Sequence, residues 1–133
     1  MLLPCSLIHV YDNSGVNLVK CFKNLTYQNN KTYPFLIKVS VQEIKAHRKT
    51  LIKKGQIYNA LIIKSRYMQP RFNGQQIKFD KNGCILVNNI NFKNKKTRNK
   101  ITLIGTSVFG LIQKEFRLYS IKLSINSINI FIK

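Results

Sequence analysis

The clearest hydrophobic pattern in the chain lies between Phe35 and Ile44. Ile37, Val39 and Val41 fall on one side of an extended chain, and the residues between them are polar. This period of two is typical of a strand with one buried face. Farther along, Ala60–Ile63 is apolar at four consecutive positions, which predicts a strand covered on both faces.

Shorter patterns predict further strands. Leu7–Val10 and Leu18–Lys23 read as two strands joined by a turn at 12–15, where Asp, Asn, Ser and Gly follow one another. After a strand at 57–64 comes a hairpin loop at 65–74. It is followed by a short strand with two apolar residues on one side, by an Asn-Gly turn, and by a last strand that begins near residue 85.

Two Asn-Gly dipeptides, Asn73-Gly74 and Asn82-Gly83, suit the positive φ angles of tight turns. Antiparallel strands joined by such turns predict a mainly β fold. We expect a small five-stranded antiparallel β-barrel with a long basic hairpin, because closing the sheet leaves no exposed edge.

The C-terminal region changes character. In Val108–Tyr119 apolar residues recur on one side at helical spacing, which predicts a short C-terminal helix. Ser120–Lys133 alternates again, but the alternation changes phase, and a turn or bulge at Asn126-Ser127 would explain the change. We therefore expect residues 1–107 to form the barrel with its basic loops. Residues 108–133 would form a helix and an extended tail of the same domain.

The net charge of the chain limits the kinds of partner that we expect. Lysine and arginine number 23 against four carboxylates, which gives a formal net charge of +19 over 133 residues. Such self-repulsion indicates a polyanionic partner: nucleic acid, an anionic membrane surface or an acidic protein. Insertion into a membrane is not expected, because no run of 18 apolar residues occurs.

The basic residues concentrate in three segments, at 45–54, 65–74 and 91–100. Arginine interleaved with aromatic residues in the second segment is typical of RNA contact, although Tyr67 and Phe72 could instead cap the barrel end. The turn at 12–15 has two readings, either presenting polar side chains to RNA or only orienting two strands. The predicted RNA-binding residues are Asn13, Ser14, Lys45, Arg48, Lys49, Lys53, Lys54, Arg66, Arg71, Lys93, Lys95, Lys96, Arg98 and Lys100.

The sequence gives little support for a catalytic site. The carboxylates are Asp12, Glu43, Asp80 and Glu115. Four carboxylates leave little for acid–base work. Ser14 with a histidine lacks a nucleophile elbow, and Cys5 with His9 lacks the further ligands that a zinc site needs. We expect no enzyme activity, no cofactor and no metal. Three cysteines without paired spacing fit a reducing compartment.

Several short motifs follow one another along the chain in a fixed order. They are Tyr11–Val16, Lys53–Gly55, Ala60–Ile63, Asn73-Gly74, Phe79, Asn82 and Ile85-Leu86. Their order and spacing resemble the signature of ribosomal protein fourteen of the large subunit, a universal family. The resemblance extends over residues 8–89 and returns at Gly105. The Gly, Arg and Pro that the family usually places around that glycine are absent, so contacts that depend on them are not carried over.

The resemblance implies a structural protein that binds large-subunit ribosomal RNA and takes part in bridges to small-subunit ribosomal RNA. Neighbouring ribosomal proteins and a silencing factor are further partners that it implies. The bias toward Ile, Lys and Asn, without an import signal at the start, favours a mitochondrial ribosome, with a plastid as the alternative. A free single-strand RNA- or DNA-binding barrel remains a rival, as does an RNA-processing enzyme, which the scarce carboxylates oppose. The first rival would need aromatic side chains on a strand face.

Overall fold

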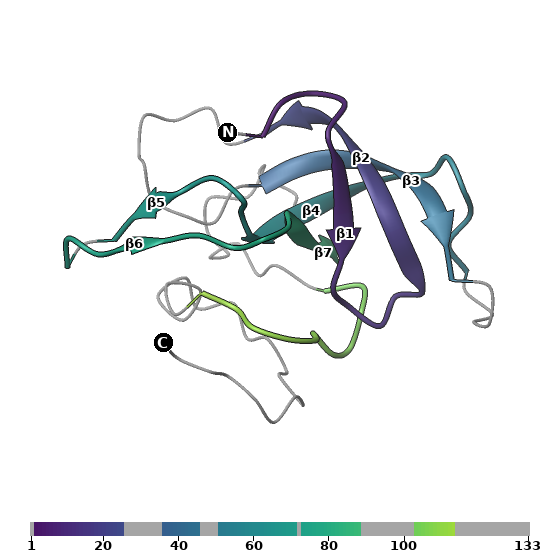
Figure 1. The fold of residues 1–133 in the computed structure, drawn as a ribbon. Helices are drawn as coiled ribbons and strands as arrows, with labels where there is room; N and C mark the ends of the chain where they lie inside the picture. The colour runs from purple at the N-terminus through teal and green to yellow at the C-terminus, as the bar shows by residue number, and fades with distance from the viewer. Residues whose placement is uncertain (1, 26–35, 46–50, 72, 89–102, 114–133) are drawn as a thin grey trace, which may run out of the picture.

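The computed structural model describes residues 2–25, 36–45, 51–71, 73–88 and 103–113. Within these ranges five strands form a closed barrel in the order β1-β2-β3-β4-β7, and β5 and β6 form a separate two-stranded hairpin (Figure 1). The strands are β1 (Leu7–Val10), β2 (Val16–Asn24), β3 (Leu36–Ile44), β4 (Ile57–Lys64), β5 (Gln69–Pro70), β6 (Gln76–Ile77) and β7 (Gly83–Val87). None of the described residues belongs to a helix that could cross a bilayer.

The barrel is mixed rather than fully antiparallel. Four of its pairings are antiparallel, but β1 and β7 run parallel, with His9 opposite Gly83 and Val10 opposite Cys84. The expectation of an antiparallel barrel was therefore wrong at the closing pair. The reason is parity: when five strands alternate in direction, the first and the last point the same way and can close only in parallel.

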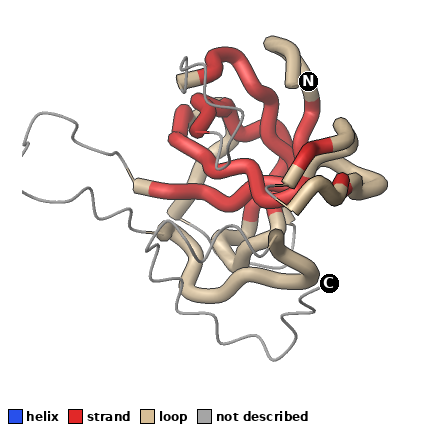
Figure 2. Tube along the Cα trace, turned by 90° about the vertical axis from the view of Figure 1, so that its left-hand side faces the viewer, coloured by secondary structure: helices blue, strands red, loops and turns tan. Residues whose placement is uncertain are grey.

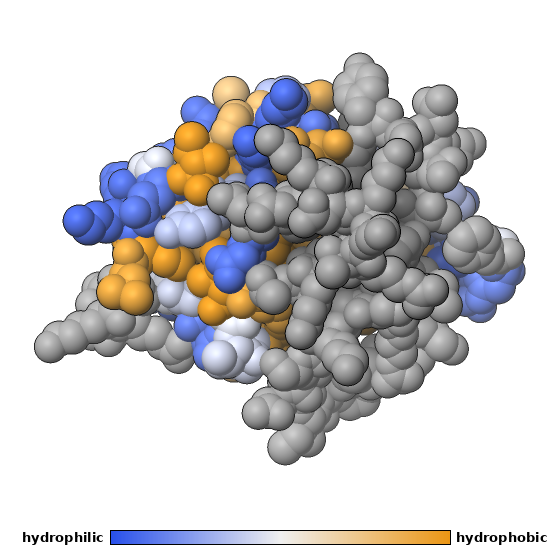
Figure 3. Space-filling model, turned by 180° about the vertical axis from the view of Figure 1, so that it is seen from behind, coloured by the Kyte–Doolittle hydropathy of each residue, from blue (hydrophilic) through white to orange (hydrophobic). Residues whose placement is uncertain are grey.

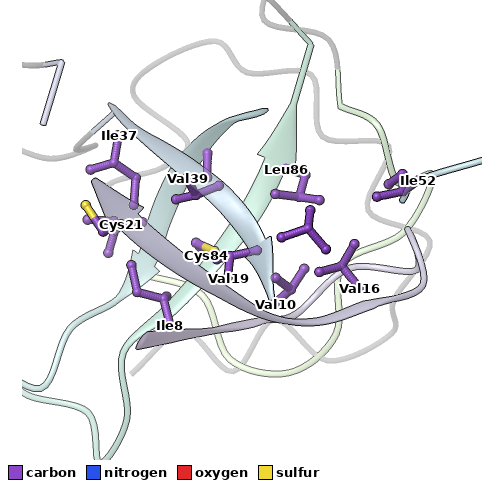
Figure 4. Close-up of a cluster of buried hydrophobic side chains, with 13 residues drawn as sticks. Ile8, Val10, Val16, Val19, Cys21, Ile37, Val39, Ile52, Cys84 and Leu86 are labelled. Atoms are coloured by element: carbon purple, nitrogen blue, oxygen red, sulfur yellow. The ribbon is translucent and has the colours of Figure 1, made fainter. Parts of the chain in front are cut away.

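The barrel interior is filled by the inward positions of every strand. Ile37, Val39 and Val41 are all buried, which confirms the alternation predicted for β3. Figure 4 shows Ile37 and Val39 among the other labelled side chains between the strands, with Ile52 closing one end. The buried members of this cluster are Ile8, Val10, Val16, Val19, Cys21, Ile37, Val39, Val41, Ile52, Ala60, Ile62, Cys84 and Leu86.

A second apolar cluster lies on the outer side of β4 and β7. Leu61 and Ile63 meet Ile85 and Val87 there, and Val108 and Ile112 pack over them. The described segment 103–113 thus covers this outer side, running below the barrel in Figure 1. The prediction that Ala60–Ile63 is covered on both faces is confirmed, since its four side chains are shared between the two clusters.

The predicted C-terminal helix is not formed where the chain is described. Residues 108–113 carry no helix, Val108 makes an isolated bridge with Asp12, and Gly110 has a φ of 81°, outside the helical range (Figure 2). The packing of this segment on the barrel determines its conformation, in spite of the helical spacing of its apolar residues. The rest of that prediction, the tail and its turn at 126–127 lie outside the described residues.

The two Asn-Gly turns differ. Gly74 has a φ of 78°, as expected for a tight turn. Gly83 is not among the glycines with positive φ and instead begins β7, where a Cβ atom would lie 2.6 Å from Cε2 of Tyr11. At the second turn, glycine is therefore required by the close approach of an aromatic ring. The strand expected to contain Phe79 is also shorter, because only Gln76–Ile77 pairs, and it pairs with β5.

Candidate nucleic-acid interface

The turn ahead of β4 carries Lys53 and Lys54, whose side chains are exposed. Its backbone is fixed to β3 by two hydrogen bonds. The amide of Gly55 donates to the carbonyl of Val41 at 2.9 Å, and the amide of Val41 donates to the carbonyl of Gln56 at 2.9 Å. The side chains of Lys53 and Lys54 therefore project from a backbone that is fixed by hydrogen bonds rather than from a free loop.

Lys45 lies at the same end of the barrel. Its amide donates to the carbonyl of Gly15 at 2.8 Å, which joins the start of the β3–β4 connection to the turn between β1 and β2. The neighbouring pair Val16 and Ile44 continues this contact in the β2–β3 register. Ile52 anchors the connection from the other side, because its side chain is 7% exposed and belongs to the barrel core. This end of the barrel thus places Lys45, Lys53 and Lys54 together.

The turn at 12–15 is used mainly within the protein. The side-chain amide of Asn13 donates to Oγ1 of Thr106 at 2.6 Å, and its Oδ1 accepts from the amide of Ser107 at 3.1 Å. The hydroxyl of Ser14 donates to the carboxylate of Asp12. These bonds favour the structural reading of the turn, in which it holds segments of the chain together. RNA contact by Asn13 and Ser14 stays a prediction.

Asp12 makes the local backbone bond that its place in the turn predicts, and also a bond to a distant strand that the sequence did not predict. Its side chain is 1% exposed, Oδ1 accepts from the amide of Ser14 at 2.8 Å, and Oδ2 accepts from the amide of Leu86 at 2.9 Å. It joins the first turn to β7, and Gly105 packs so closely that a Cβ there would lie 2.9 Å from Cβ of Asp12. In the described residues the hydroxyl of Ser14 is thus used within the turn itself.

The hairpin that carries β5 and β6 leaves the opposite end of the barrel (Figure 1). Arg66 is exposed, and its amide donates to Oδ1 of Asn82 at 2.9 Å, which fixes the base of the hairpin. Arg71 is half-buried near the tip, where its amide donates to the carbonyl of Gln75 at 2.8 Å. Tyr67 is 63% exposed, so it does not cap the barrel end. Phe72 lies outside the described residues.

Lys64 and Tyr11 form a contact that no sequence pattern predicted. Nζ of Lys64 lies 3.8 Å from the centre of the Tyr11 ring, and partial burial lowers the pKa of Lys64. A second unforeseen contact joins the hairpin to segment 103–113, where Nε2 of Gln113 donates to Oε1 of Gln69 at 2.9 Å and both side chains are buried. Neither pair could be found from local spacing, because each joins distant parts of the chain.

Other predicted RNA-binding residues lie outside the described ranges; they are Arg48, Lys49, Lys93, Lys95, Lys96, Arg98 and Lys100. In the described part of the chain, no three His, Cys, Asp or Glu side chains gather as a metal site would require. Figure 3 shows hydrophobic residues interspersed with hydrophilic ones on the described surface seen from behind.

The whole chain was also compared with known protein families. A family model described as Ribosomal protein L14p/L23e matches residues 1–128. The match includes every motif that carried the resemblance, and it continues past residue 89 through most of the C-terminal region. The chain therefore belongs to the ribosomal protein L14p/L23e family, whose members are structural proteins of the large ribosomal subunit and not enzymes.

Proposed function

We propose that this protein binds large-subunit ribosomal RNA chiefly through its exposed lysine and arginine side chains. The observation that carries the proposal is the turn with Lys53 and Lys54, whose cationic groups project from a backbone fixed by hydrogen bonds to β3. Lys45 adds a third positive charge at the same end of the barrel. Because the backbone of this turn is already fixed, little backbone conformational entropy is lost there when RNA binds.

Binding would act on the RNA backbone rather than on base sequence. Each lysine that neutralises a phosphate releases condensed counterions, so affinity falls steeply as salt rises. At the opposite end of the barrel, Arg66 and the exposed ring of Tyr67 supply the guanidinium and aromatic groups that suit a non-helical stretch of RNA. Both ends would be used, because the ribosomal RNA is large enough to contact them together.

Further partners follow from membership of the family. We include bridges to small-subunit ribosomal RNA, contacts with neighbouring ribosomal proteins and docking of a silencing factor in the proposal. The composition favours a mitochondrial ribosome in the matrix, with a plastid ribosome as the alternative. Sedimentation of the tagged protein in organelle lysate tests this assignment: migration with large subunits supports it, and free protein favours an unattached single-strand-binding barrel.

The RNA contact is tested with the purified full chain and large-subunit ribosomal RNA in a filter-binding titration at several salt concentrations. The variant carrying Lys53→Gln and Lys54→Gln should bind more weakly, with a slope of log affinity against log salt shallower by roughly 0.7 to 0.9 per lost phosphate contact. Lys81→Gln, at an exposed lysine outside the predicted set, is the control for loss of one charge. An unchanged slope in the double variant would contradict the assignment of this turn.

A further inference from the structure

The pairing of β2 with β3 contains a bulge that brings two side chains to one side. Cys21 pairs with Val39, and the next register pair is Lys23 with Lys38, so Phe22 is the extra residue on β2. Cys21 points into the barrel and is fully buried, whereas Phe22 is 44% exposed and Lys23 is exposed. Bulges of this kind redirect side chains and are frequent next to functional sites.

The surroundings of Phe22 are cationic. Lys20, two residues before Phe22 on β2, is exposed and pairs with Ser40 of β3. Lys23 and Lys38 lie directly opposite each other, and like charges in that position destabilise a strand pair. Within the described residues, none of these three lysines has an ion-pair partner. Glu43, the carboxylate on β3, lies at the other end of that strand, where its Oε2 accepts from Nδ2 of Asn17 at 3.0 Å.

An exposed aromatic ring among uncompensated lysines matches the way proteins hold single-stranded nucleic acid. A base has a flat face that stacks on a ring, and the adjoining phosphates require cations. A phosphate between Lys23 and Lys38 would also relieve their mutual repulsion. A double-stranded segment suits the site less well, because its bases are already stacked on each other.

We propose that the outer face of β2 and β3 at this bulge binds an unpaired nucleotide of RNA, with the base on Phe22 and a phosphate between Lys23 and Lys38. This inference rests on the proposed function, since the nucleotide would belong to a single-stranded part of ribosomal RNA. It adds a site on a strand face to the loops assigned above. The ends of β2 and β3 that carry it lie at the end of the barrel from which the hairpin leaves (Figure 1).

A protein partner is the competing occupant, because Leu7 on the neighbouring strand β1 is also exposed. Leu7 pairs with Lys20, which places its side chain beside the cationic row. A mainly apolar partner would bury these lysines without supplying counter-charges, at a large desolvation cost. The charge of the face therefore favours RNA, and binding of a protein there is an outcome of the test.

The first experiment uses fluorescence. The chain has no tryptophan, so Phe22→Trp creates a single reporter at the site. Phe109→Trp is the matched control, because Phe109 is 45% exposed and lies on the segment 103–113. Stacking of a base should quench the fluorescence of the Phe22→Trp protein when a short single-stranded RNA is added, and a double-stranded RNA of equal length should quench it much less. The control should change little with either RNA.

The second experiment measures affinity for the same single-stranded RNA by fluorescence anisotropy of a labelled oligonucleotide. Phe22→Leu keeps an apolar side chain but removes the stacking face, and it should weaken binding by about 5- to 100-fold. The variant carrying both Lys23→Gln and Lys38→Gln should make the salt slope shallower by about 0.7, the loss of one phosphate contact. Phe109→Leu should bind as the parent protein does. Circular dichroism checks that each variant keeps the β fold.

The outcomes separate this inference from the proposed function. If the parent protein binds ribosomal RNA but the fluorescence of Phe22→Trp is not quenched and Phe22→Leu binds normally, the strand-face site is wrong and the proposed function stands. If the parent protein binds no ribosomal RNA at low salt, the proposed function fails. Quenching of the Phe22→Trp fluorescence by a purified neighbouring ribosomal protein, and not by RNA, would overturn the assignment of the occupant.

Discussion

Nζ of Lys64 at the end of β4 lies 3.8 Å from the centre of the Tyr11 ring, which follows β1. The two residues are 53 positions apart by subtraction of their numbers, and they meet where β7 closes the barrel between β1 and β4. The same ring leaves room only for hydrogen at Gly83, the first residue of β7. The amide of Phe109 donates to the carbonyl of Tyr11 at 2.7 Å, so the covering segment is tied to the same point.

The contact between Lys64 and Tyr11 should stabilise the fold measurably. A cation over an aromatic face contributes about 0.5 to 2 kcal/mol, depending on desolvation. In a double-mutant cycle of Tyr11→Leu and Lys64→Met, urea unfolding should therefore give a coupling free energy in that range. Additivity of the two single changes, within measurement error, would show that the ring does not stabilise the charge.

Removing the carboxylate of Asp12 should destabilise the protein more than removing an exposed one. Asp12→Ala leaves the buried amide of Leu86 without its acceptor, which costs about 1 to 3 kcal/mol. Glu43→Gln is the control, because that exposed residue can keep its bond to Asn17 and should change stability by less than about 0.5 kcal/mol. Urea midpoints of both variants give the comparison, and equal midpoints would contradict the structural role of Asp12.

Gly83 should resist even the smallest side chain. Gly83→Ala places a methyl group 2.6 Å from the Tyr11 ring, and overpacking of this kind costs about 1 to 3 kcal/mol. Because the ring is the obstacle, the same substitution in a Tyr11→Ala background should cost much less. Thermal unfolding of the four proteins measures this difference. A loss that is equal in both backgrounds would place the strain in the backbone instead.

The three cysteines should differ in reactivity. Cys5 is exposed, whereas Cys21 and Cys84 are buried, and burial raises the pKa of both buried thiols. Iodoacetamide should therefore alkylate Cys5 of the folded protein first, with the other two protected until urea is added, as mass spectrometry of peptides can show. A Cys5→Ser protein should show almost no modification without urea. Rapid labelling of Cys84 would contradict the closed barrel.

The same raised pKa values give a direction for pH. The unfolded chain loses its thiol protons above the ordinary cysteine pKa of 9.0, while the buried thiols keep theirs to higher pH. Their contribution to stability is therefore complete below pH 9.0 and falls as the pH rises above it. Cys84→Ala should have a smaller decrease in its urea midpoint than the parent over that alkaline range.

Much of the secondary structure was accessible from the sequence. The predicted bounds of the first strand and of the strand at 57–64 agree with β1 and β4, and the alternation around Val39 marked the inward face of β3. These features are local, because side-chain direction in a strand alternates whatever its neighbours are. Over residues 108–113 the predicted helix is absent for the complementary reason. Val108 and Ile112 have helical spacing, but both pack on the outer side of β4 and β7 in a chain that is not helical.

The candidate interface was predictable where its residues share one loop. Lys53 and Lys54 appear in the sequence as a charged pair before a strand, and the structure exposes both. Asn13 had two possible roles, and its bonds to Thr106 and Ser107 favour the structural one, which local sequence could not show. Phe22 was not identified, because an apolar residue in a strand gives no sign of a bulge. Its exposure depends on the register with β3.

By itself, the sequence determined the positions of the barrel strands, the strongly basic character and, through ordered motifs, the ribosomal family. Hydrophobic period, charge and motif spacing are properties of residues close together in the chain. Only the tertiary structure decided that segment 103–113 covers β4 and β7 and that Phe22 lies among lysines. Each of these depends on which distant segments pair and in what register. Pairing and register are set by the burial of apolar side chains throughout the barrel and not by any single segment.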